Sequence, residues 1–341
     1  MELTGMELTN MEVIKVLSLF ISNLKAIGKS QKHKLLKKIS ETFDLKSITL
    51  SDLTSIVSSF FALDKKTIDD NISEALSIIE NCFNKDIEII TFLDSSYPSL
   101  LKEIYDPPVV LYFKGSPEKL DLPSISVVGT RSATGKALRA AFETAFYLSV
   151  HNIAVVSGLA IGIDNEAHKG SISAGGFTVA VMGCGLDKIY PVSNRKTALE
   201  IVESGGILIS EYQPGALPLK YHFPERNRII SGLSSASIII QAPGKSGALI
   251  TADYALDHGR EVFVHEAGLS SPFGDGGMSL VSEGALLFSN PQEIGKYYGF
   301  DSSNSYINNK SSYDDTKNIE DEINGYVVNH KGVLYRRAGY A

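Results

Sequence analysis

The sequence predicts an α/β fold in which a small all-helical domain precedes a doubly wound, mostly parallel sheet. Two observations carry this prediction: nearly continuous apolar runs rich in β-branched residues, and helix-length segments between them with apolar residues at three- and four-residue spacing. The predicted strands are Ile125–Gly129, Ile153–Gly158, Phe177–Gly183, Gly206–Tyr212, Ala236–Pro243 and Glu261–Ala267. The helices expected between them include Lys136–Val150, Arg195–Val202 and Leu249–Leu256. Most of the 29 glycines lie in this region, many of them directly after the strands, where such sheets bind ligands.

The helical domain is expected over residues 11–80, after an unstructured start at residues 1–10. Apolar spacing predicts helices over Val13–Leu24 and Lys32–Ile39, with a break at Gly28. The break has two interpretations: a helix-hairpin-helix turn whose amides hold a phosphate, or a small helical bundle with a solvated lysine face. The lysines around it are Lys25, Lys29, Lys32, Lys34, Lys37 and Lys38.

The sheet domain is expected over residues 84–295, because two further strands, Ile87–Phe92 and Val109–Phe113, precede the first glycine turn. The polar and acidic residues 296–325 indicate a linker. Residues 326–341 form a tail that is too short to build a core alone.

The composition restricts the partners. Lys and Arg total 32 against 39 Asp and Glu, a formal net charge of −7, which argues against broad, non-specific binding to nucleic acid or anionic membranes. The two cysteines, Cys82 and Cys184, build neither a disulfide framework nor a zinc site, so a cytoplasmic location is expected. No apolar stretch predicts a membrane span.

The first glycine turn runs from Gly129 through Thr130 and Arg131 to Gly135 and Lys136. It is not a dinucleotide fingerprint, because Arg131 stands at the second glycine of G-x-G-x-x-G. It is not a P-loop either, because five residues separate its glycines and no Ser or Thr follows the lysine. With both motifs excluded, three features of this segment are left to interpret: a glycine turn, free N–H groups at a helix start, and an arginine. These predict an anion site that suits phosphate, and no cofactor.

Other strand ends repeat this chemistry. The residues concerned are Gly183, Gly185 and Lys188; Lys220, Phe223, Arg226, Asn227 and Arg228; and Lys245, Ser246 and Gly247. One phosphate would not need so many cations, whereas a polymer of phosphates would. Tyr221, His222 or Phe223 could stack a base between the backbone contacts. Arg226 and Arg228 have a second interpretation, as ion-pair partners of Glu211 or Glu225.

Three residues suggest catalysis but have simpler interpretations. Asp164 and His168, four residues apart on an expected helix, fit a catalytic or metal pair, although a capping aspartate with a packed histidine is favoured. Cys184 is expected to be a small buried residue, because the sequence fixes no nearby base to activate it. No spacing makes a convincing metal site, and nothing demands an enzyme.

Several motifs occur in a characteristic order. They are Gly129-Thr130-Arg131, Ser157-Gly158-Leu159-Ala160, Gly162-Ile163-Asp164, Gly183-Cys184-Gly185-Leu186-Asp187, Tyr190-Pro191, Ser210-Glu211-Tyr212, Phe223-Pro224-x-Arg226-Asn227-Arg228-Ile229-Ile230 and Ser246-Gly247-Ala248-Leu249-Ile250-Thr251-Ala252. In these motifs, from about Tyr97 to Phe288, the chain resembles the DNA-processing protein A family (DprA, also called Smf). The resemblance implies an extended Rossmann fold, a sterile-alpha-motif-like domain before it, and a winged-helix domain that is truncated or absent after it.

The same resemblance implies a function. Members of the family bind single-stranded DNA without cutting it, protect incoming DNA during natural transformation, load the RecA recombinase and dimerise through the Rossmann domain. The DNA-binding residues predicted from the loops and the resemblance together are Gly129, Thr130, Arg131, Gly158, Gly183, Gly185, Lys188, Lys220, Phe223, Arg226, Asn227, Arg228, Lys245, Ser246 and Gly247. The sequence departs from the family pattern at Ile161, Gln241, Glu266 and Met278. The alternative function is a Rossmann-fold nucleotide-processing enzyme similar to phosphoribohydrolases.

Overall fold

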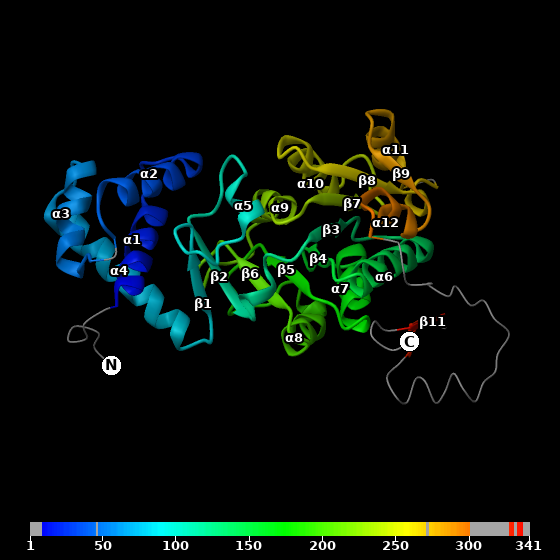
Figure 1. Cartoon of the computed structure of the whole chain (residues 1–341), viewed down its shortest axis with the longest axis horizontal. Helices are drawn as coiled ribbons and strands as arrows, with labels where there is room; N and C mark the ends of the chain where they lie inside the picture. The colour runs from blue at the N-terminus through cyan, green and yellow to red at the C-terminus, as the bar shows by residue number, and fades with distance from the viewer. Residues whose placement is uncertain (1–8, 46, 271–272, 301–326, 331–332, 337–341) are drawn as a thin grey trace.

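The computed structural model describes residues 9–45, 47–270, 273–300, 327–330 and 333–336. In these residues, helices α1 to α4 lie at one end of the long axis, and a nine-stranded sheet with its flanking helices occupies the rest (Figure 1). No helix among them is both long and apolar enough to cross a membrane. Residues 1–8 of the predicted start, most of the predicted linker and parts of the predicted tail lie outside the described residues.

The N-terminal region is helical, as the apolar spacing predicts. Its helices are α1 (Asn10–Asn23), α2 (Lys29–Thr42), α3 (Leu50–Phe60) and α4 (Lys65–Phe83). Helix α1 begins within the stretch predicted as unstructured, because Thr9 and Glu12 form a capping box that satisfies its first amides. The helices share a buried apolar core with strands β1 (Glu88–Thr91) and β2 (Val110–Gly115) and helix α8 (Arg195–Glu203), so packing is continuous from the helices into the sheet.

The sheet confirms the predicted doubly wound α/β class. Its strands are β1 (Glu88–Thr91), β2 (Val110–Gly115), β3 (Ser124–Val128), β4 (Ala154–Ser157), β5 (Thr178–Met182), β6 (Ile207–Ser210), β7 (Ala236–Ile239), β8 (Glu261–His265) and β9 (Leu286–Phe288). Their order is β1-β2-β6-β5-β4-β3-β7-β8-β9. Strand β2 runs antiparallel to both β1 and β6, and every pairing from β6 to β9 is parallel.

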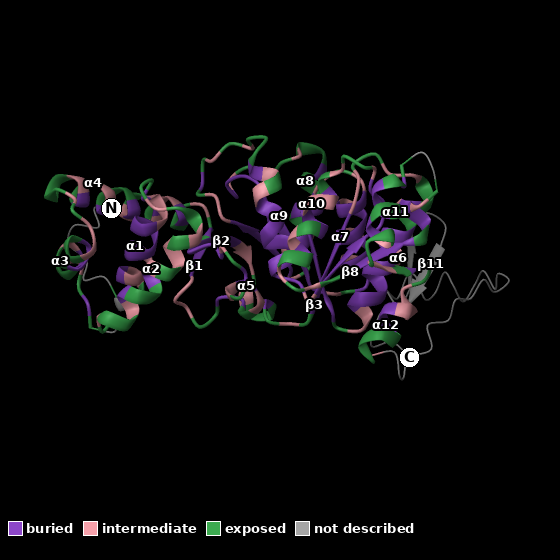
Figure 2. Ribbon diagram, turned by 90° about the horizontal axis from the view of Figure 1, so that it is seen from above, coloured by how far each residue is buried: buried purple, intermediate pink, exposed green. Residues whose placement is uncertain are grey.

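Helices cover both faces of the sheet. They are α5 (Ser99–Lys102), α6 (Gly135–Val150), α7 (Ile163–Ser173), α8 (Arg195–Glu203), α9 (His222–Gly232), α10 (Gly247–Asp257), α11 (Asp275–Ser282) and α12 (Gln292–Tyr298). Successive residues of β3 point to opposite faces: Val127 packs against α6 and α7, and Val128 packs into the core shared with α9 and α10. The central strands β3, β4 and β5 are accordingly buried along their length (Figure 2). Burial on both faces explains why they read as continuous apolar runs.

The C-terminal segments differ from the sequence prediction at two places. Strand β9 was not predicted, and α12 continues to Tyr298, into the region expected to be a linker. Within the predicted tail, Val327–His330 and Val333–Arg336 form a two-stranded antiparallel hairpin, β10 and β11. The three residues of β9 give too little periodicity for the strand to be recognised from the sequence.

Candidate nucleic-acid interface

The carboxyl ends of the parallel strands meet at one edge of the sheet. The chain order reverses at β3, with β4, β5 and β6 on one side and β7, β8 and β9 on the other. Open α/β sheets bind ligands in the crevice outside such a reversal. The loops after β3 and β7 lie side by side there, because the amide of Thr130 donates a hydrogen bond to the carbonyl of Gln241 at 2.8 Å.

An aromatic ring at this edge joins three loops. The guanidinium carbon of Arg131 lies 5.8 Å from the centre of the Phe223 ring. The ring centres of Tyr190 and Phe223 are 5.4 Å apart at an interplanar angle of 43°. Gly183 leaves room for this contact, because a Cβ atom there would lie 3.0 Å from Cδ1 of Phe223. Arg131 and Tyr190 are exposed, so the cation and the rings form a surface suited to a phosphate and a stacked base.

Three lysines at the same strand ends have solvent-exposed side chains. Lys188 comes shortly before Tyr190, Lys220 shortly before Phe223, and Lys245 lies in the loop after β7. In the part of the chain that the structure describes, the ion pairs and side-chain hydrogen bonds involve none of these three ammonium groups. Their charges are therefore available to a polyanion.

The start of α10 contributes backbone amides to this edge. Ser246 precedes the helix, and its hydroxyl accepts a hydrogen bond from the amide of Ala248 at 3.3 Å. Gly247 is exposed, and nothing lies within 4 Å of where its Cβ would be. Its carbonyl accepts a hydrogen bond from the side-chain amide of Asn227 at 3.0 Å, which ties α9 to α10.

Arg226 is buried beneath this surface. Its Nη1 donates to the carbonyl of Gly158 at 2.9 Å and to the carbonyl of Val181. Gly158 provides the space, because a Cβ atom there would lie 2.7 to 2.9 Å from the guanidinium group. Burial lowers the pKa of Arg226 to about 10, and the charge of Asp164 opposes that shift. The side chain therefore joins the ends of β4 and β5.

Arg228 is committed to two carboxylates. Its Nε lies 2.9 Å from Oδ2 of Asp106, and its Nη2 lies 2.7 Å from Oε1 of Glu211. Only 3% of its side chain is exposed. Burial alone would lower the pKa of Arg228, but Glu211 and Asp106 raise it above its ordinary value. Of its two sequence interpretations, the ion pair with Glu211 is the one present.

The sequence predicts Arg226, Asn227 and Arg228 as DNA contacts, and the structure places all three in buried positions. Each is less than a tenth exposed and bonded to protein groups. We propose that they support the interface from beneath, since a buried side chain that is bonded to protein groups cannot turn toward a phosphate without leaving those groups unpaired.

The candidate catalytic residues also have internal partners. Oδ2 of Asp164 accepts hydrogen bonds from the amides of Gly158 and Ala160, at 3.0 and 3.4 Å, so it caps the preceding loop rather than its own helix. Burial raises its pKa, although Arg226 opposes the shift. Burial also lowers the pKa of His168 to about 3 and raises that of Cys184 to about 11. His168 contacts the hydroxyl of Thr178 at 2.8 Å.

Comparison with known proteins identifies the family. The model described as DNA recombination-mediator protein A matches residues 88–299, which is more than half of the chain. The chain belongs to this family.

Relatives within the DNA recombination-mediator protein A family extend the match. Protein Smf of Borreliella burgdorferi is 33% identical over 305 residues, which cover 89% of this chain and 91% of that protein. The crystal structure of DNA processing protein A (DprA) from Streptococcus pneumoniae is similar with a TM-score of 0.66 at 33% identity, over 85% of this chain and 98% of that one. DNA processing protein A from Helicobacter pylori is similar with a TM-score of 0.57 at 30% identity, over 63% and 98%. Its structure concerns a single-stranded DNA binding mode of that protein.

The four departures from the family's motifs lie in two environments. Ile161 and Met278 are 49% and 58% exposed, and Glu266 is also exposed. Gln241 is buried in the loop just after β7, where its Oε1 accepts a hydrogen bond from the amide of Thr134 at 2.9 Å. Among the described residues, its Nε2 has no hydrogen-bond partner.

The predicted set omits three residues that the structure brings to this region. Tyr190 contacts the Phe223 ring, Asp106 pairs with Arg228, and Lys29 pairs with Glu225 at 2.7 Å. An aromatic residue before a proline in a strand-end loop is a signal that could have identified Tyr190. The other two pairs join positions 122 and 196 residues apart, and no local pattern reveals such distant partners.

Proposed function

We propose that this chain binds single-stranded DNA as a recombination mediator and does not cut it. The observation that carries the proposal is the cluster of Arg131, Phe223 and Tyr190 at the sheet's reversal point. Exposed lysines without side-chain partners in the described structure accompany it at the same strand ends. The similarity to the Helicobacter pylori protein supports the same ligand.

In the proposed binding mode, cations contact the phosphates and aromatic rings contact the bases. Arg131, Lys220 and Lys245 contact phosphates, and the amides at the start of α10 add donors. Phe223 and Tyr190 stack bases, which is independent of base sequence because every base has a π-face. A path with a few discrete cations is compatible with a net charge of −7, because such charges act within about 8–10 Å at ordinary salt.

We extend the proposal to the activities that the family resemblance implies. The chain protects incoming single-stranded DNA in the cytoplasm during natural transformation, loads RecA onto it and acts as a homodimer formed through the Rossmann domain. Membership of a family described as recombination mediators supports this part. A dimer would place two copies of the cluster on one strand and raise the affinity through effective concentration.

The alternative, an enzyme that processes nucleotides, has less support. Its candidate acids are Asp164, which is bonded to loop amides, and Glu211, which is paired with Arg228. Of the carboxylate oxygens of these two residues, only Oε2 of Glu211 is buried without a hydrogen-bond partner within the described part of the chain.

A gel-shift comparison tests the proposed ligand. Single-stranded oligo-dT is expected to shift at lower protein concentration than a duplex of equal length, because a duplex offers no unstacked bases to Phe223 and Tyr190. Equal or tighter binding of the duplex would contradict the proposal. Incubation with a panel of nucleotides, with release of free base as the readout, examines the enzyme: we expect no release, and release would favour the alternative.

A further inference from the structure

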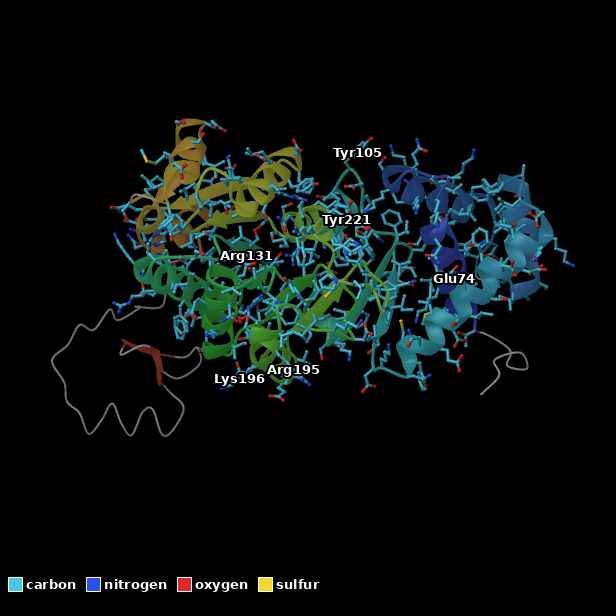
Figure 3. The ribbon with its side chains drawn as sticks, turned by 180° about the vertical axis from the view of Figure 1, so that it is seen from behind. Glu74, Tyr105, Arg131, Arg195, Lys196 and Tyr221 are labelled. Atoms are coloured by element: carbon cyan, nitrogen blue, oxygen red, sulfur yellow. The ribbon has the colours of Figure 1, made fainter. Side chains whose placement is uncertain are left out.

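We propose that the single-stranded DNA path continues beyond the sheet edge, over Tyr221 and Tyr105, onto the exposed lysines of α2. This inference rests on the proposed function, because it extends the same ligand from Phe223 to the N-terminal helices. Figure 3 shows Tyr221 and Tyr105 between Arg131 and those helices. The N-terminal region would then be a second contact surface for DNA.

The first step is the attachment of α2 beside α9, the helix that carries Phe223. The ammonium group of Lys29, at the start of α2, lies 2.7 Å from Oε2 of Glu225 in the first turn of α9. The hydroxyl of Tyr212 donates to the same carboxylate oxygen at 3.2 Å. One turn further along α2, the ring of His33 lies 5.6 Å from that of Phe92. The beginnings of α2 and α9 are therefore neighbours.

The second step is the presence of two tyrosines whose rings face solvent. Tyr221 directly precedes α9 and is 59% exposed. The centres of the Tyr221 and His222 rings are 4.6 Å apart in an edge-on contact, and those of His222 and Tyr212 are 3.9 Å apart in a stacked one. His222 therefore supports one side of the Tyr221 ring. Tyr105 is 73% exposed in the loop between α5 and β2. Exposed aromatic rings on rigid supports are the residues on which single strands stack their bases.

The loop of Tyr105 is anchored to the buried base of the site. Its neighbour Asp106 forms the ion pair with Arg228, at 2.9 Å. Arg228 in turn holds Glu211, which directly follows β6. The same network that supports the sheet edge therefore also positions Tyr105.

The third step is the lysine face of α2. The helix contains five lysines and one glutamate. Lys29 is used by Glu225, and the ammonium group of Lys32 donates to the carbonyl of Ser22. Lys34 and Lys38 lie one turn apart, both exposed, and neither has a carboxylate partner in the described ion pairs. The ammonium group of Lys34 lies 5.6 Å from the centre of the Tyr105 ring.

These steps fit a single strand better than an acidic protein. The run from Phe223 through Tyr221 and Tyr105 ends at the ammonium group of Lys34. It therefore offers aromatic rings for bases and a cation for a phosphate, the two chemical groups that a single strand presents. The run also joins the candidate interface without a gap between elements, since α2 and α9 are in contact. An acidic protein would need the lysines but not this continuity.

The test compares a short oligo-dT of about six nucleotides with a long one of about 25, a contrast that spans typical single-strand site sizes. Binding is measured by fluorescence anisotropy over a range of salt concentrations. The double variant Lys34→Ala/Lys38→Ala is compared with Lys65→Ala/Lys66→Ala, which removes the same charge from α4 outside the proposed path.

We expect the α2 variant to bind the short oligonucleotide as the unchanged protein does. For the long one, its salt slope should fall by about 1.4, since each phosphate contact contributes about 0.7. When the salt concentration falls from 1 M to 0.1 M, the affinity of the α2 variant for the long oligonucleotide should therefore rise by a factor roughly 25-fold smaller than that of the unchanged protein. The α4 variant should resemble the unchanged protein at both lengths. Tyr105→Ser should weaken only the long complex, and Tyr105→Phe should preserve it.

The outcomes separate this inference from the function on which it rests. If the α2 variant binds the long oligonucleotide as tightly as the unchanged protein, the path ends at the sheet, the lysine face is left for an acidic partner and the inference is overturned. An equal loss in the α4 variant would overturn it as well, because the effect would then be one of general charge. Absence of binding of either oligonucleotide by the unchanged protein would refute the proposed function itself.

Discussion

Two sets of cations lie close together in this protein, and they differ in what surrounds them. Arg226 and Arg228, in α9, are 5% and 3% exposed and bonded to backbone carbonyls or carboxylates. Arg131, Lys220 and Lys245, in the loops around them, are exposed. The difference teaches that charge at a strand end is not itself evidence of ligand binding. The buried arginines would have to break bonds to protein groups before they could bind a phosphate, whereas the exposed cations would only have to release water.

The largest expected effect is on the buried set. Arg228→Met should lower the free energy of unfolding by about 3–5 kcal/mol, because it leaves the carboxylates of Glu211 and Asp106 without their counter-ion. Urea unfolding measures this loss. Arg131→Ala is the matched control and should change the unfolding free energy by no more than about 0.5 kcal/mol. If Arg228→Met left the free energy of unfolding unchanged, the buried arginines would not differ from the exposed cations in this respect, and the comparison would be wrong.

The next effect concerns the aromatic ring between the two sets. Phe223→Ala should weaken oligo-dT binding by roughly 1–3 kcal/mol, the usual value of one base stacked on an aromatic side chain. Phe223→Tyr keeps the π-face and should bind nearly as well. Anisotropy titration of both variants gives the comparison, and equal losses in the two would mean that Phe223 does not act by stacking.

A pH effect sharpens the comparison, because it should alter stability through a buried group. Burial lowers the pKa of His168 to about 3, whereas an unfolded histidine titrates near 6.5. Between these values the unfolded chain binds the proton and the folded one does not. The stabilisation is therefore complete above about pH 6.5 and is lost progressively as the pH falls. At pH 5 this histidine alone costs about 2 kcal/mol.

Unfolding at pH 7.5 and pH 5 measures that loss. The His168→Gln variant no longer has the titrating group, so its stability should fall less between the two pH values. An identical fall in both proteins would show that His168 does not carry the effect.

The smallest effect concerns one exposed lysine. Lys245→Ala should reduce the salt slope of oligo-dT binding by about 0.7, the value for one phosphate contact on a single strand. Lys119 is also exposed but precedes β3, at the amino end of the parallel strands. Lys119→Ala should leave the slope unchanged, and a slope reduced equally by both substitutions would argue for a diffuse charge effect.

The sequence predicted the sheet and the exposed part of the site because their signals are local. Strands buried on both faces give continuous apolar runs, and a glycine after a strand, as at Gly129 and Gly183, marks a loop at the carboxyl edge. Arg131 could be identified for this reason.

The sequence left two interpretations of the α9 arginines open, a DNA contact or an ion pair, and local patterns could not decide between them. Exposed and buried arginines have the same letter in a sequence, and the partner that fixes Arg228, Asp106, lies 122 residues away. The contact between Lys29 and Glu225 spans 196 residues, so the proximity of α2 to the site was equally hidden. Strand β9, three residues long at the sheet edge, was too short to show a period.

The central claim is that exposed cations at the sheet edge bind the backbone of single-stranded DNA. Its most direct test is the salt dependence of oligo-dT binding by the unchanged protein and by Arg131→Ala/Lys220→Ala, with urea unfolding to establish that both are equally folded. We predict binding at low salt that weakens steeply as salt rises, and a slope smaller by about 1.4 in the double variant. Absence of binding at low salt, or an unchanged affinity and slope in the double variant, would contradict the claim.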